Sequence, residues 1–153
     1  MEVRADTWSM AGWSGGKEGR LYVDVLEEGV AVSIYGYDKI LDTPVGAVGY
    51  FTERTKDINM DAFFEFVGAR RLSNVKGCVA RGYDGEDLAY NVKTELERAG
   101  VEVEVDGEPH AKRISLRSDG LLNIIYFRQY KQTPCSETEL IPLGDNNKNL
   151  ASV

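Results

Sequence analysis

The stretch from residue 75 to residue 105 reads VKGCVARGYDGEDLAYNVKTELERAGVEVEV and predicts a strand, a helix and a second strand in succession. Residues 75–80 form a short apolar run, which is typical of a buried strand. Apolar residues share one face of a helix over 86–99, and valines alternate with glutamates over 101–105. This order predicts a βαβ unit, whose crossover is right-handed if the two strands are parallel neighbours.

Three further strands are predicted before this unit, over residues 21–26, 30–35 and 45–51. They are rich in β-branched and aromatic residues, and apolar side chains alternate along the first. The Glu-Glu-Gly sequence of residues 27–29 is typical of a tight hairpin connection. We therefore expect these strands to form an antiparallel meander.

A second helix is predicted between the meander and the βαβ unit. Its apolar residues, from Met60 to Val67, recur at spacings of three and four and form one continuous stripe. Asn59 is the expected N-cap, and Gly68 is placed to end the helix.

The strongest hairpin signal follows the βαβ unit. Residues 114–116 and 121–127 predict two strands, and the Asp119-Gly120 dipeptide between them favours a type I′ turn. With the other elements, this hairpin predicts an α/β (α+β) fold, a sandwich of a mixed, largely antiparallel sheet with two main helices.

The composition divides the chain into three parts. Residues 1–20 are rich in Gly and predict a flexible arm, in which Trp8 and Trp13 either fold back onto the core or offer a contact. Residues 21–130 predict a single α/β domain, and residues 131–153 a polar, disordered tail with one apolar patch at 140–143.

The formal net charge of −7 over 153 residues predicts an acidic surface that repels phosphate backbones, so we expect no nucleic-acid partner. Two cysteines make no disulfide framework, and no apolar run reaches the length that spans a bilayer. Together with the lack of a signal peptide, these features predict a cytoplasmic protein without a membrane partner.

The candidate catalytic residues are the two cysteines and the only histidine. His110 lies in a turn between two predicted strands, Cys78 in a predicted core strand and Cys135 in the tail. A pair of His110 with either cysteine would make a nucleophile–base dyad, whereas a thiol in a core strand is usually inert. A single histidine excludes a two-histidine zinc site, and no phosphate-cradling glycine pattern is present, so we expect neither a metal nor a cofactor.

The order of the elements and several short segments resemble the chemoreceptor glutamine deamidase (CheD) family. The segments are Val30-Ala31-Val32, Val45-Gly46-Ala47-Val48, Gly68-Ala69-Arg70-Arg71-Leu72, Ala99-Gly100-Val101 and Ala111-Lys112-Arg113-Ile114. The resemblance spans residues 21–127 and implies an α/β sandwich, a chemotaxis phosphatase as a class of partner, and a Cys–His–Thr triad that deamidates glutamine.

The family's catalytic positions are not kept. Gly29 stands in place of the cysteine, Tyr50 in place of the histidine, and the threonine position falls near Val23. Glycine cannot form an acyl intermediate, and a tyrosine with a usual pKa near ~10 is a poor base at neutral pH. The resemblance therefore implies a noncatalytic protein-binding or regulatory module related to chemotaxis, with Gly29 and Tyr50 facing one another across a former active site.

Three kinds of function stay open at this point. The first is the binding module, which would contact another protein through Trp8, Trp13, the acidic surface or the 140–143 patch. The second is an active cysteine-dependent amidase or deamidase that uses Cys78 or Cys135 with His110. The third is a small viral-type or assembly protein, for which a homo-oligomer is an expected form.

Overall fold

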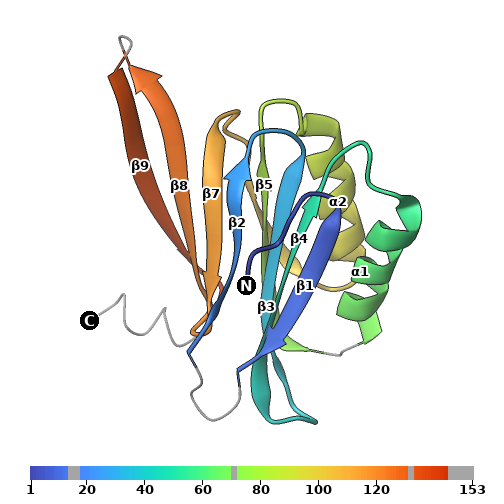
Figure 1. Ribbon diagram of the computed structural model, residues 1–153. Helices are drawn as coiled ribbons and strands as arrows, with labels where there is room; N and C mark the ends of the chain where they lie inside the picture. Colours follow the sequence, from blue (N-terminus) through green and yellow to red (C-terminus); the bar gives the residue numbers. More distant parts are fainter. Residues whose placement is uncertain (14–17, 70–71, 131–132, 145–153) are drawn as a thin grey trace.

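The structure is a computed structural model that describes residues 1–13, 18–69, 72–130 and 133–144 (Figure 1). Its elements, in chain order, are β1 (Thr7–Gly12), β2 (Arg20–Leu26), β3 (Val30–Asp38), β4 (Thr43–Phe51), α1 (Asp57–Ala69), β5 (Ser73–Arg81), α2 (Glu86–Arg98), β6 (Glu102–Asp106), β7 (Ala111–Arg117), β8 (Leu121–Tyr130) and β9 (Thr133–Pro142). The strands form a five-stranded mixed sheet in the order β1-β4-β3-β5-β6 and a four-stranded antiparallel sheet in the order β2-β7-β8-β9. The predicted α+β sandwich with two main helices is confirmed.

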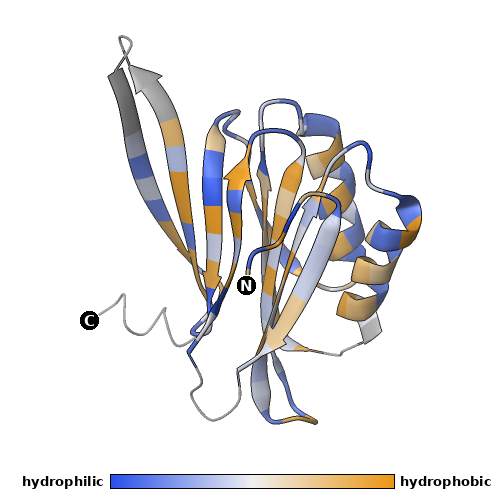
Figure 2. Cartoon of the chain, viewed as in Figure 1, coloured by the Kyte–Doolittle hydropathy of each residue, from blue (hydrophilic) through white to orange (hydrophobic). Residues whose placement is uncertain are grey.

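The molecule has three layers and two apolar cores. Helices α1 and α2 cover one face of the five-stranded sheet, and the four-stranded sheet packs on its other face (Figure 1). Phe63 of α1 and Val92 of α2 are buried in the helix-side core, whereas Val23 and Ile124 are buried in the core between the sheets. Figure 2 shows the mixture of hydrophobic and hydrophilic residues on α1 that is typical of a helix with one buried face.

The strand–helix–strand prediction agrees with the structure, since β5 pairs in parallel with β6 and α2 connects them. The predicted meander is partly wrong. β3 and β4 form the expected antiparallel pair, but β2 pairs with β7 in the other sheet. Residues 27–29 therefore cross between the sheets and do not close a hairpin.

Local contacts explain this crossing. Gly29 donates its N–H to the Asp84 carboxylate at 2.9 Å, and its carbonyl accepts the N–H of Gly82 at 2.8 Å. Its φ of 77° is one that glycine adopts without strain. These bonds tie Gly29 to the loop between β5 and α2. The next strand, β3, therefore starts beside β5 and not beside β2.

Two further predictions are corrected in detail. α1 begins at Asp57, so Asn59 lies inside the helix and does not cap it. In the β7–β8 turn only Gly120, with φ 84°, has a positive φ, while a type I′ turn needs two such residues. The Gly120 N–H donates to the Arg117 carbonyl at 3.0 Å, and three residues separate the strands, as in a type I turn followed by a left-handed glycine.

The ends of the chain contain more regular structure than the composition suggests. Residues 7–12 of the predicted arm form β1, and residues 133–142 of the predicted tail form β9, paired along its whole length with β8. β9 is anchored by Ile141, and Leu143 is buried just beyond it. Residues 145–153, which belong to the same predicted tail, lie outside the described residues. Neither described helix, each 13 residues long, has the length and apolar character needed to cross a bilayer.

Candidate functional site

The structure does not join the thiol and imidazole that the sequence nominates. Cys78 lies on β5 in the core between the sheets, where burial is the main cause that raises its pKa to about 12. His110 lies in the connection between β6 and β7, and no hydrogen bond between described residues links it to Cys78. Cys135 belongs to β9, but its side chain falls outside the described residues. Cys78 is therefore a protonated core thiol at neutral pH.

Gly29 and Tyr50 do not face one another. Tyr50 is half-buried on β4 and lines a hollow of about 340 Å³ together with Glu27 and Glu28. A Cβ atom at Gly29 would instead meet the Phe51 carbonyl oxygen at 2.1 Å, so this position points at backbone. Burial raises the pKa of Tyr50, which keeps its phenol protonated and unsuited to the role of a base.

A carboxylate at the edge of the same hollow is held by hydroxyl groups. Asp6 accepts hydrogen bonds from the Thr52 hydroxyl at 2.6 Å and from the Thr55 hydroxyl. These bonds, with that of Thr52 the stronger cause, lower the pKa of Asp6 from its usual value. They fix the residue at the start of β1 to the segment that follows β4.

Both tryptophans fold back onto the protein. Trp8 packs against Phe63 and Phe66 of α1, with ring centroids 5.6 and 5.3 Å away. Trp13 is buried and stacks on Tyr35 at a centroid distance of 6.1 Å. Trp13 is therefore a structural residue, whereas Trp8 packs against α1 and stays partly exposed.

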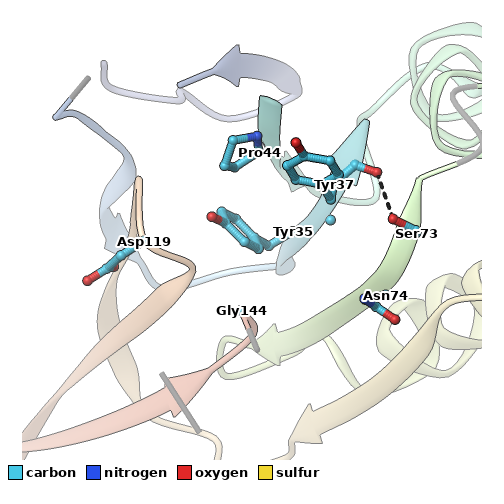
Figure 3. A pocket seen from close by; sticks show the side chains of 8 residues that line it. Tyr35, Tyr37, Pro44, Ser73, Asn74, Asp119 and Gly144 are labelled. Carbon is cyan, nitrogen blue, oxygen red and sulfur yellow. Dashed lines mark hydrogen bonds between the residues drawn. The ribbon is translucent and has the colours of Figure 1, made fainter. Parts of the chain in front are cut away.

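The structure brings together a different set of residues at the end of the sheets. A cavity of about 280 Å³ opens there between β3, β5 and the turns of the other sheet (Figure 3). Its lining residues come from five segments of the chain and are Tyr35, Gly36, Tyr37, Pro44, Ser73, Asn74, Asp119 and Gly144. Alternation along β3 places both tyrosines on one face of the strand.

Hydrogen bonds fix the walls of this tyrosine cavity. The Tyr35 hydroxyl donates to the Ser118 carbonyl at 2.9 Å, which ties β3 to the β7–β8 turn. The Ser73 hydroxyl donates to the Tyr37 carbonyl at 3.2 Å, the bond drawn dashed in Figure 3. Burial, and then the nearby Asp119 carboxylate, raise the pKa of Tyr35, so this phenol stays neutral. The cavity is thus a preformed recess with aromatic walls and a polar rim.

Two aliphatic side chains stand beside the cavity, on the turn between β3 and β4. Ile40 is 88% exposed and Leu41 is 58% exposed, although both are apolar. The Asp38 carboxylate accepts the backbone N–H of Ile40 at 3.0 Å and that of Leu41 at 3.1 Å, and therefore holds the turn in one shape. We call the exposed pair Ile40 and Leu41 the Ile-Leu tip. Tyr37 leads into this turn and also lines the cavity, so the tip and the cavity adjoin one another.

A second polar cluster lies buried between the sheets. The Lys112 side chain has no exposed surface, and its Nζ lies 2.7 Å from Oδ2 of Asp106 and 2.7 Å from the Glu108 carbonyl. The same ammonium group stands 5.1 Å from the centre of the Tyr126 ring, whose hydroxyl donates to Glu139 at 2.6 Å. Asp106 belongs to the five-stranded sheet and Lys112 to the four-stranded sheet, so the pair ties the two layers together.

The sequence contains a signal for the Ile-Leu tip but none for the cavity. An Ile-Leu pair inside a turn, where polar residues are usual, marks an exposed apolar contact. The cavity depends on five segments meeting at one end of two sheets, which spacing along the chain does not specify. Comparison of the chain with protein-family models, curated proteins and solved structures found no match.

Proposed function

We propose that this chain is a noncatalytic protein-binding module and that the Ile-Leu tip, with the adjoining tyrosine cavity, contacts the partner protein. The observation that carries the proposal is the exposure of Ile40 and Leu41 on a turn that Asp38 holds in place. Preorganised apolar side chains bind with a smaller loss of conformational entropy than mobile ones. The partner is expected to cover both side chains and to place an apolar side chain of its own in the cavity.

The protonation of Cys78 supports a binding role over the cysteine-enzyme alternative. With a pKa of about 12, the thiol lacks the thiolate form that attacks an amide. The resemblance to the glutamine deamidases supports a more specific proposal. In it, the chain is a cytoplasmic regulatory protein of chemotaxis that has lost its catalytic residues. In that form Gly29 and Tyr50 occupy the former catalytic positions.

Site-specific photocrosslinking in cells tests the proposal. A crosslinking residue at position 40 should capture one protein, whereas the same residue at the exposed Tyr83, far along the chain, should not capture it. The purified partner should then bind the Ile40→Ser/Leu41→Ser variant at least ~10-fold more weakly, because burial of one aliphatic side chain contributes about 1.5–3 kcal/mol. Tyr83→Ser is the matched control. Equal affinity of the tip variant and the wild-type chain would rule out the Ile-Leu tip as the contact surface.

A further inference from the structure

A second cavity, of about 370 Å³, lies at the carboxyl ends of the parallel strands β5 and β6. Arg81 is the last residue of β5, and Val105 and Gly107 stand at the end of β6. The first half of α2 closes the cavity with Tyr90 and Lys93. In open sheets with parallel strands, ligands bind in the crevice outside the carboxyl ends of the strands, and the volume falls within the range of small-molecule sites.

Arg81 is the main cation that lines this cavity. Its side chain is only 15% exposed, and its Nε is buried with no hydrogen-bond partner among the described residues. Its ion-pair partner is Glu86, at 3.4 Å, whose side chain is 87% exposed. The Nε atom has no surface that a ligand can reach, so an anion from outside the chain would meet only the part of the guanidinium that stays exposed and now faces Glu86. Glu86 is free to swing into solvent when such an acceptor arrives.

The rest of the lining defines the kind of ligand. Lys93 adds a second positive charge, and it is held only loosely by Glu97 at 3.5 Å. The exposed side chains of Tyr90 and Val105 offer an apolar surface beside these two cations. Gly107 also lines the cavity, and a Cβ atom there would meet no atom within 4 Å, so the space beside this residue is open.

We propose that this cavity binds a small molecule in which a phosphate or carboxylate group is attached to a flat apolar ring. Arg81, through the guanidinium group that now pairs with Glu86, and Lys93 hold the anionic oxygens, and the ring lies against Tyr90 and Val105. The anion displaces Glu86 from Arg81. This site is separate from the Ile-Leu tip and does not depend on the function proposed for it.

An NMR titration of the full chain with phenyl phosphate, benzoate and inorganic phosphate tests the site and separates the two anion chemistries. We expect saturable shifts of the Arg81 Nε–H and of the amides at the start of α2, with at least one ring-bearing anion bound ~10-fold more tightly than inorganic phosphate. Arg81→Gln should weaken this binding at least ~10-fold, since a hydrogen bond to a charged group contributes about 1.5–3 kcal/mol. Arg98→Gln is the matched control, because Arg98 lies exposed at the end of α2, does not line the cavity and pairs with Glu95.

Two variants keep the test decisive if Arg81→Gln does not fold. Gly107→Val adds a side chain to the lining without removing a charge and should weaken binding several-fold. Glu86→Gln should increase the affinity several-fold, because it removes the carboxylate that competes for Arg81. The proposal is overturned if the shifts do not saturate, if Arg98→Gln weakens binding as much as Arg81→Gln, or if Glu86→Gln weakens binding. Equal weak binding of all three anions would show an adventitious ion only and would also overturn it.

Discussion

Replacement of Lys112 with methionine is expected to destabilise the protein more than the replacement of any exposed lysine. Methionine matches the length of the aliphatic stem but removes the ammonium group. The Asp106 carboxylate, whose side chain is 7% exposed, then remains buried at the junction of the sheets without its cation. The Glu108 carbonyl loses its donor at the same time.

The magnitude follows from the burial of the pair. Removal of one partner from a buried ion pair costs about 3–5 kcal/mol, because the other charge stays desolvated and uncompensated. With a urea m-value of about 2 kcal/mol/M, this loss corresponds to a midpoint about 1.5–2.5 M lower. Removal of both charges should cost less, since a buried pair is often replaced by uncharged residues at little cost.

Urea unfolding followed by circular dichroism measures the effect, with Lys112→Met, Asp106→Asn and the double variant forming a cycle. Lys93→Met is the control, since this lysine is partly exposed and should change stability by less than ~1 kcal/mol. We expect the double variant to be more stable than Lys112→Met alone. A loss below ~1 kcal/mol for Lys112→Met, or a double variant less stable than it, would refute the account of the buried pair.

Three further outcomes are expected. In a Cys135→Ser background, a disulfide reagent at pH 8 should label Cys78 at least ~100-fold more slowly in the folded than in the urea-unfolded chain, because burial raises its pKa to about 12; similar rates would contradict this. The lowered pKa of Asp6 stabilises the folded state above pH 3.8, and that contribution is lost as the pH falls through the folded-state value. Asp6→Asn should therefore lower the melting temperature near pH 6, and the difference from the wild type should shrink as the pH falls below 3.8, whereas a constant difference would exclude this linkage. Gly29→Ala should destabilise the folded protein by at least ~2 kcal/mol, since its Cβ would lie 2.1 Å from a carbonyl oxygen. Gly68→Ala, with open space around its Cβ, should stabilise α1 by up to ~1 kcal/mol. Chemical denaturation of both variants checks that the two effects have opposite signs.

Local sequence patterns predicted the helices and strands better than they predicted which strands pair with one another. The alternating valines and the stripe on α2 gave the βαβ unit, because both patterns record which side of an element is buried. The same patterns made β2 and β3 look like a hairpin, since alternation does not record which sheet a strand joins. Gly29 decides that question through its bonds to Gly82 and Asp84, which lie more than fifty residues away in the chain.

The candidate sites depended even more on distant contacts. The sequence nominated Cys78 and His110 by residue type, but catalytic chemistry needs a distance and an exposure that type does not fix. The sequence analysis named Lys112 only within a segment that resembles the deamidase family, whereas its burial depends on Asp106, which reaches it from the opposite sheet. The glycines that follow Trp8 predicted a flexible arm, whereas Trp8 lies in β1, pairs with Gly49 of β4 and packs against the phenylalanines of α1.

The pairing of β2 with β7 has a consequence for how this protein is made. Leu21 lies opposite Leu116, so the second sheet cannot begin to assemble around β2 until most of the chain has left the ribosome. Until then β2 presents an unpaired apolar edge, and closure of so long a loop is slow. We infer that a nascent chain arrested before residue 111 would have β2 exposed to chaperones, whereas one long enough for residue 117 to have left the ribosome would begin to shield it.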